Sequence, residues 1–129
     1  MIETIDVGHS RVVGLRASGR VTHQDYAHVL VPTLEAALAR ASAAGHKLRF
    51  YYELGEDFEG YTKHALWDDA KIGGMHLHDF ERIAVVSEHP MILAAVRMFG
   101  PLVSGEVRVW PNQARVQARA WIGLADHEK

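Results

Sequence analysis

The order of strand-like and helix-like patterns along the chain restricts its fold most strongly. Residues 2–7 alternate apolar and polar side chains, and a Gly8-His9 turn leads directly to a second strand pattern at 10–17. Two strands joined so closely predict an antiparallel hairpin. Helix and strand patterns then alternate to the end of the chain, which requires right-handed crossovers and a mostly parallel sheet.

The sequence predicts an α/β fold with five strands and four helices. Thr22, followed three residues later by Asp25, predicts the capped start of the first helix. Pro32 lies inside that helix pattern and predicts a kink or break, because proline lacks a backbone donor. The strands are expected at 2–7, 10–17, 46–54, 82–87 and 106–110, and the helices at 22–45, 58–71, 90–99 and after Asn112, with 55–60 as a loop.

The strand at 46–54 has one apolar and one polar face. Side chains alternate between the two faces of a strand. The polar face suggests that helices lie mainly on one side of the sheet, over the apolar face. The apolar face contains Leu48, Phe50, Tyr52 and Leu54, and the polar face contains Lys47, Arg49, Tyr51 and Glu53.

Length and composition indicate one globular domain over residues 1–129, with no cysteine for disulfides or thiolate chemistry. The net charge of −2 argues against nucleic acid as a general partner. The N-terminus lacks the pattern of a signal peptide. The apolar run at 91–103 is too short to span a bilayer and contains Arg97. A cytoplasmic protein with no membrane span is therefore expected.

Four segments together resemble the SpoIIAA-like group of the STAS superfamily. The resemblance implies a right-handed β-α superhelix, distantly similar to CRAL-TRIO domains. This agrees with the predicted order, in which the hairpin adds an antiparallel N-terminal edge strand. The resemblance implies no defined activity for this subgroup. The segments are "ASGRVTHQDYAHVLVPTLEAAL" (17–38), "YELGEDFEGYTKHALWDDAK" (52–71), "DFERIAVVSEHP" (79–90) and "GEVRVWP" (105–111), and they cover about half of the chain.

The superfamily's anti-sigma-factor antagonists carry a phosphorylatable Ser at the start of the helix after the third strand. Here that segment reads "LGEDFEGYT" and contains no Ser. Thr62 is the nearby hydroxyl, and its flanking residues do not match the family's motif. An antagonist role therefore remains only as an alternative in which Thr62 replaces the Ser.

A small apolar pocket with one acid is predicted where the third strand passes into its helix. Phe58, Tyr61, Trp67 and Asp69 are its candidate ligand-binding residues, because ligands of parallel sheets tend to bind beyond the carboxyl ends of strands. Asp69 lies beside the apolar arc of the helix. Either it bonds a neighbouring loop, or it is a buried general acid or base, which is the enzyme alternative.

No other motif predicts catalysis, a cofactor or a metal. The chain has nine histidines, and His76, His78 and Asp79 form the densest cluster. No third ligand or HExxH-like motif accompanies them, so solvated histidines are expected. No catalytic residue, metal or cofactor is assigned, since the chain contains neither a P-loop nor a dinucleotide fingerprint.

The helix at 90–99 is apolar almost all the way round. A helix that covers a sheet needs only one apolar stripe. We therefore expect a second contact on this helix, either with another protomer or with a neighbouring element of the same chain. Met91, Leu93, Ala94 and Met98 are the predicted interface residues. The first hypothesis is a non-catalytic binding module that forms a homodimer or binds a protein partner. An apolar small molecule or lipid is the alternative ligand.

Overall fold

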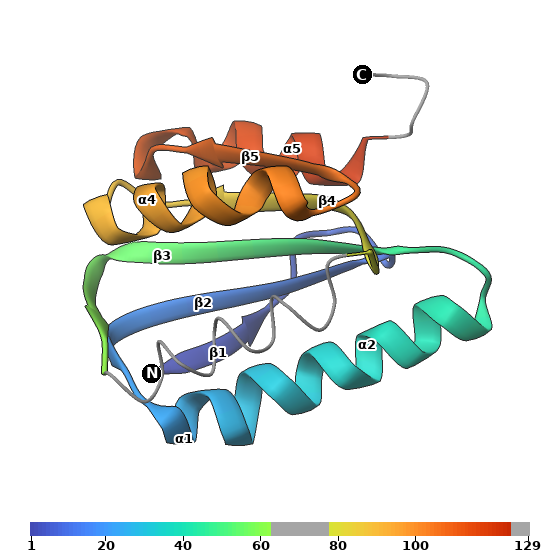
Figure 1. The fold of residues 1–129 in the computed structure, drawn as a ribbon, viewed down its shortest axis with the longest axis horizontal. Helices are drawn as coiled ribbons and strands as arrows, with labels where there is room; N and C mark the ends of the chain where they lie inside the picture. The colour runs from blue at the N-terminus through green and yellow to red at the C-terminus, as the bar shows by residue number, and fades with distance from the viewer. Residues whose placement is uncertain (63–77, 125–129) are drawn as a thin grey trace.

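The computed structural model describes residues 1–62 and 78–124, and within them it forms one five-stranded mixed sheet (Figure 1). The strand order is β1-β2-β3-β4-β5. β1 pairs antiparallel with β2, and all other neighbours are parallel. The predicted sheet is thus confirmed. The strands are β1 (Ile2–Ile5), β2 (Val12–Val21), β3 (Leu48–Tyr61), β4 (Phe80–Val86) and β5 (Glu106–Trp110).

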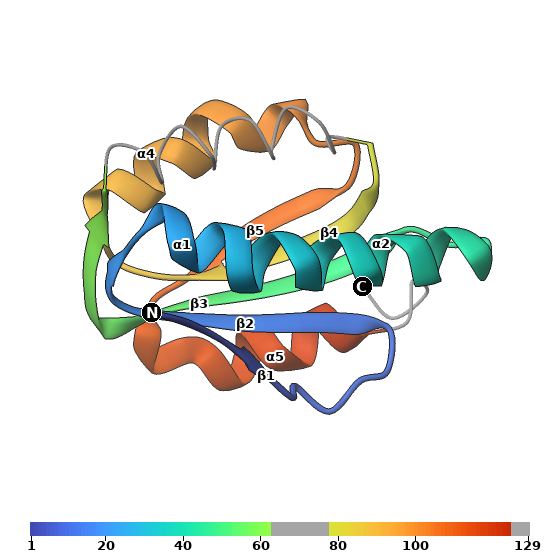
Figure 2. The same cartoon turned by 90° about the horizontal axis from the view of Figure 1, so that it is seen from below.

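Helices cover the two faces of the sheet unequally. Figures 1 and 2 show α2 and α4 on one face and α5 on the other, so the helices of the described residues lie mainly on one face, as predicted. Two 3-10 turns flank β5, at Gly100–Leu102 and Asn112–Ala114. The helices are α1 (His23–Asp25), a π-helical segment (Tyr26–Leu30), α2 (Val31–Ala43), α4 (Pro90–Phe99) and α5 (Arg115–Gly123).

The first helical segment begins as the sequence predicted. The backbone N–H of Asp25 donates to the hydroxyl of Thr22 at 3.2 Å, and the N–H of Thr22 donates to Oδ2 of Asp25 at 2.8 Å. Pro32 is the second residue of α2 and directly follows the π-helical segment. Because proline has no N–H to continue the α-helical pattern, the irregularity falls where it was expected.

Two hydrophobic cores occupy the two faces of the sheet. The larger core lies under α2 and α4, where the apolar face of β3 meets side chains such as Leu15 and Leu34. The smaller core lies under α5 and contains Tyr51, Ala84, Val86, Ala118, Trp121 and Ile122. The polar face of β3 is therefore covered by α5 of the same chain.

Three local predictions are wrong. Residues 55–60 are not a loop, and residues 58–61 do not begin the predicted helix 58–71, because β3 continues to Tyr61 and pairs with β2 as far as Val21. Residues 63–71 of that predicted helix lie outside the described residues. The extended pairing contains register shifts around Gly19, whose φ of 60° is accessible to glycine. Asn112 does not cap the last helix, which begins at Arg115. In the part of the chain that the structure describes, no helix is long and apolar enough to cross a membrane.

Candidate functional site

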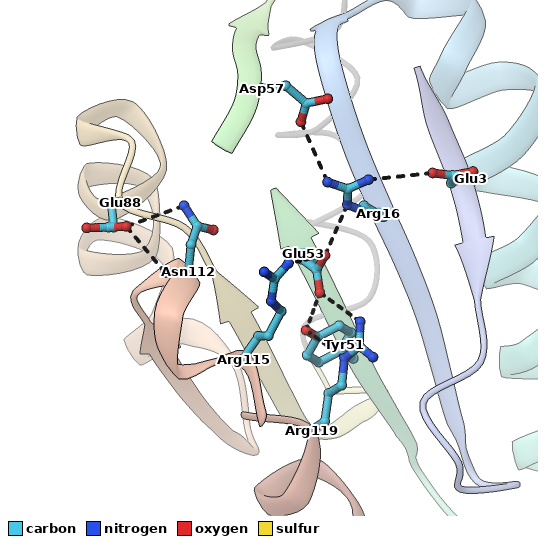
Figure 3. Close-up of polar contacts among 9 residues, drawn as sticks. All are labelled: Glu3, Arg16, Tyr51, Glu53, Asp57, Glu88, Asn112, Arg115 and Arg119. Atoms are coloured by element: carbon cyan, nitrogen blue, oxygen red, sulfur yellow. Dashed lines mark hydrogen bonds and ion pairs between the residues drawn. The ribbon is translucent and has the colours of Figure 1, made fainter. Parts of the chain in front are cut away.

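Polar side chains from three elements converge on the α5 face at the middle of β3 (Figure 3). Glu53 and Tyr51 are two residues apart on β3 and therefore share a face. Arg16 is the register partner of Glu53 on β2. Arg115 and Arg119 are four residues apart on α5, so they project from the same side of that helix. We call these five residues the Glu53 cluster.

The carboxylate of Glu53 has hydrogen-bond donors on both oxygens. Its Oε1 accepts from the hydroxyl of Tyr51 at 2.6 Å and from Nη2 of Arg119 at 3.0 Å. Its Oε2 accepts from Nε of Arg16 at 3.0 Å and lies 3.7 Å from Nη1 of Arg115. The side chain is only 2% exposed. A buried carboxylate needs this degree of compensation.

The pKa of the Glu53 carboxyl lies below its ordinary value of 4.5. Burial raises this pKa, but hydrogen bonds from Tyr51 and Arg119 and the charges of Arg119 and Arg115 outweigh the burial. Glu53 is thus ionised at neutral pH. An ionised carboxylate with both oxygens engaged is a poor general acid or base.

Tyr51 joins the carboxylate to α5. Its hydroxyl donates to Glu53 and accepts from Nε of Arg119 at 3.2 Å. Burial, together with the hydrogen bond to Glu53, raises the pKa of Tyr51 to about 12. The phenol therefore stays protonated at neutral pH. The guanidinium of Arg119 also lies 5.4 Å from the centre of the Tyr51 ring.

Further carboxylates surround the Arg16 side of the cluster. Arg16 lies 4.0 Å from Glu3 and 3.8 Å from Asp57, in addition to its bond with Glu53. Glu3 and Asp57 contact Arg16, whereas Arg115 and Arg119 share the carboxylate of Glu53. This geometry ties β2, β3 and α5 together.

A second polar contact joins the ends of β4 and β5 (Figure 3). Both the backbone N–H and the side-chain amide of Asn112 donate to Oε2 of Glu88 at 3.4 Å. α5 begins at Arg115 with Ala114 at its N-cap position, so Asn112 lies two residues too early in the chain to cap it.

The structure brings together two of the four predicted pocket residues. Phe58 and Tyr61 are both buried, and their ring centres lie 5.3 Å apart. The ring of His89 lies 5.3 Å from Phe58, and the ring of Tyr26 lies 5.9 Å from Tyr61. The two aromatics thus take part in core packing. Trp67 and Asp69 lie outside the described residues, so the pocket remains a prediction.

The four predicted interface residues of α4 differ in exposure. Met91 and Leu93 are half-buried, whereas Ala94 and Met98 are exposed. Larger apolar exposure gathers at the end of α4 and in the 3-10 turn after it. Met98 is 69% exposed, Phe99 46% and Leu102 55%. We call these three residues the apolar patch.

An open cleft of about 480 Å³ lies elsewhere, between the second half of α2 and the β1–β2 hairpin. Apolar surface comes from Val13, Ala37 and Leu48. Arg40 contributes a guanidinium group and His46 an imidazole ring. Sequence reasoning did not predict this cleft. Within residues 1–62 and 78–124, no three histidine or carboxylate side chains gather closely enough to bind a metal ion.

The fold defines a STAS-type α/β module, and comparison with known proteins assigns the family. Residues 12–123 match the family model described as SpoIIAA-like. The chain belongs to the SpoIIAA-like family. It also resembles the crystal structure of an uncharacterized protein from the DUF3478 family with a SpoIIAA-like fold from Shewanella loihica PV-4. That similarity has a TM-score of 0.72 and 25% identity, and it covers 95% of this chain and 92% of the other. No curated protein matches.

Sequence reasoning missed the Glu53 cluster as a unit. The alternation of Arg49, Tyr51 and Glu53 indicated a polar sheet face, but nothing identified its cover. The spacing of Arg115 and Arg119 was the available signal, since two arginines one turn apart match a buried carboxylate on a neighbouring strand.

Proposed function

We propose that the chain is a cytoplasmic, single-domain binding module without catalytic activity, and that it contacts a protein partner through the apolar patch. The observation that carries this proposal is the exposure of Met98, Phe99 and Leu102 within five consecutive positions. Isolated exposed apolar residues are ordinary, whereas a cluster of large ones is typical of an interaction surface. Ala94 on the preceding turn of α4 enlarges the patch.

The Glu53 cluster supports a non-catalytic role. It contains a buried carboxylate, yet Glu53 is ionised and accepts hydrogen bonds on both oxygens. The enzyme alternative depends on Asp69, and the antagonist alternative depends on Thr62. Thr62 directly follows β3, and its N–H donates to the carbonyl of Val21 at 2.9 Å.

Site-specific photo-crosslinking tests the proposed surface. A photoreactive residue replaces Leu102 in the full chain, and the chain is irradiated in its host cells. We expect a discrete crosslinked product, because Leu102 lies in the patch. The matched control carries the same photoreactive residue at Val116, which is 74% exposed but lies on α5, on the other face of the sheet. Equal crosslinking at both positions, or none at Leu102, contradicts the proposal.

The cleft favours a second candidate function, the binding of a small ligand with an apolar body and an anionic group. Its apolar walls suit the body, and Arg40 and His46 suit the anionic group. Anilinonaphthalene sulfonate is a probe of this chemistry. A fluorescence titration measures the affinity of the chain for this probe. The affinity is expected to fall in Arg40→Glu and to stay unchanged in Met98→Ser. The reverse pattern would place the probe on the apolar patch and contradict this candidate.

A further inference from the structure

We infer that the protein partner is a second copy of this chain, and that the two copies join by antiparallel pairing of their β5 strands. The inference rests on the proposed function, because it names the partner that the apolar patch contacts. In the resulting dimer, a two-fold axis normal to the sheet would run between the two β5 strands. The sheet would then continue from one copy into the other.

β5 is the edge strand that offers hydrogen bonds for such pairing. It pairs with β4 on one side, and no described strand lies on its other side. The N–H of Ser87 donates to the carbonyl of Trp110 at 3.0 Å, so the polar backbone groups of Trp110 point toward β4. Backbone direction alternates along a strand. The backbone N–H and C=O of Arg108 therefore also point toward β4. The backbone N–H and C=O of Val107 and Val109 point outward, away from β4.

The charges of β5 favour a register centred at Val107 over one centred at Arg108. With the two-fold axis at Val107, each Glu106 faces Arg108 of the other copy, and the two Val107 residues exchange their N–H···O bonds. With the axis at Arg108, two like charges face each other. Within one copy, Nη2 of Arg108 lies 3.4 Å from Oε2 of Glu106, and the two side chains remain 52% and 36% exposed, so they can exchange this contact for one across the axis. The sequence of β5 is therefore complementary to itself in the first register.

The apolar patch lies close to this edge. A Cβ placed on Gly100, between Phe99 and Leu102, would lie 3.8 Å from Cβ of Val107. Val109 packs with the larger core, on the face that α2 and α4 cover, and Val107 points to the same face. Because the two-fold axis is normal to the sheet, the faces covered by α2 and α4 in the two copies lie on the same side of the joined sheet. The two patches would then flank the strand pair and add apolar contact to its hydrogen bonds.

Charged residues on an edge strand can instead prevent pairing. The two explanations differ in what a charge exchange does. If the charges only protect the edge, neither their sign nor their order affects association. If they set the register, each single reversal weakens association and the double exchange restores it.

Sedimentation equilibrium of the purified full chain, from micromolar to near-millimolar concentration, tests the inference. We expect the mass to rise from 14.4 kDa toward twice that value. Val107→Pro removes an outward N–H and should weaken association more than about tenfold, while leaving the β4 pairing intact. Val107→Thr keeps the N–H and is the matched control. Thermal unfolding by circular dichroism confirms that each variant is folded.

The charge pair gives a test that does not depend on proline. Glu106→Arg and Arg108→Glu should each weaken the dimer, and the double variant should restore it. A wild-type chain that stays monomeric at all concentrations overturns the inference. A dimer insensitive to Val107→Pro and to both charge reversals also overturns it. In either case, a crosslinked product at Leu102 whose mass is not twice that of the chain would leave the proposed function standing.

Discussion

Oε1 of Glu53 lies 3.0 Å from Nη2 of Arg119, and this contact joins the buried face of β3 to α5. The same carboxylate bonds Arg16 of β2, so one side chain connects three elements. A buried acid in an α/β sheet suggests catalysis at first sight. Here its bonding partners assign it to the assembly of the fold, and the proposed interaction surface lies away from it, at the end of α4.

Glu53→Gln is expected to lower the free energy of unfolding by about 2–4 kcal/mol, because it leaves Arg16 and Arg119 without their buried counter-charge. Chemical denaturation with urea measures the change. Glu3→Gln is the matched control, since Glu3 is 49% exposed and lies 4.0 Å from Arg16. Its effect should stay below about 1 kcal/mol. If the two substitutions lowered the free energy of unfolding equally, the buried contacts of Glu53 would add no more stability than the exposed contact of Glu3.

The free energy of unfolding should vary with pH in the acid range, because Glu53 takes up a proton there. Its pKa is lower in the folded chain than its ordinary value of 4.5. The unfolded chain therefore binds the proton more readily, and stability rises with pH between the two pKa values. The contribution of Glu53 is fully present above pH 4.5 and is lost as the pH falls through the folded pKa. Urea unfolding at a series of acid pH values should show a shallower pH dependence for Glu53→Gln than for wild type.

Tyr51 should stay protonated well into the alkaline range. Its pKa is raised to about 12, whereas exposed tyrosines titrate near 10. In ultraviolet titrations up to about pH 11, wild type and Tyr51→Phe should therefore show tyrosinate absorbance of the same amplitude. A smaller amplitude in Tyr51→Phe would mean that Tyr51 ionises normally and is not held by Glu53.

Thr22→Ala should destabilise the chain by about 1 kcal/mol, because it removes the hydroxyl that accepts from Asp25 N–H. Thr22→Ser keeps the acceptor and should retain most of the stability. Thermal or urea unfolding compares the two variants. If Ala and Ser at this position behave alike, the cap does not stabilise the helix start.

Local patterns predicted much of the fold. The alternation of strands and helices gave the sheet, and the bounds of α4 and β5 agree with the predicted 90–99 and 106–110. Thr22 and Asp25 identified a helix start because capping involves residues close in sequence. The length of β3 was missed because its acidic segment resembles a loop, while its pairing with β2 is a long-range property.

The candidate site was less predictable for the same reason. Phe58 and Tyr61 were expected together and do touch, since they are close in sequence. Glu53, Arg16 and Arg119 come from distant segments, and the sequence did not indicate that α5 would cover the polar face. Met98 was predicted at an interface from the excess apolar residues of its helix. Its exposure agrees with that reasoning, while the interface itself remains a proposal.

Amide hydrogen exchange at β5, measured at low and high protein concentration, tests the proposed interaction surface most directly. We expect the N–H of Arg108 to be protected at both concentrations, because it points toward β4. The N–H of Val107 should exchange rapidly in dilute solution and slowly in concentrated solution, where a second copy covers it. Rapid exchange at Val107 under conditions in which the chain is dimeric would contradict the account.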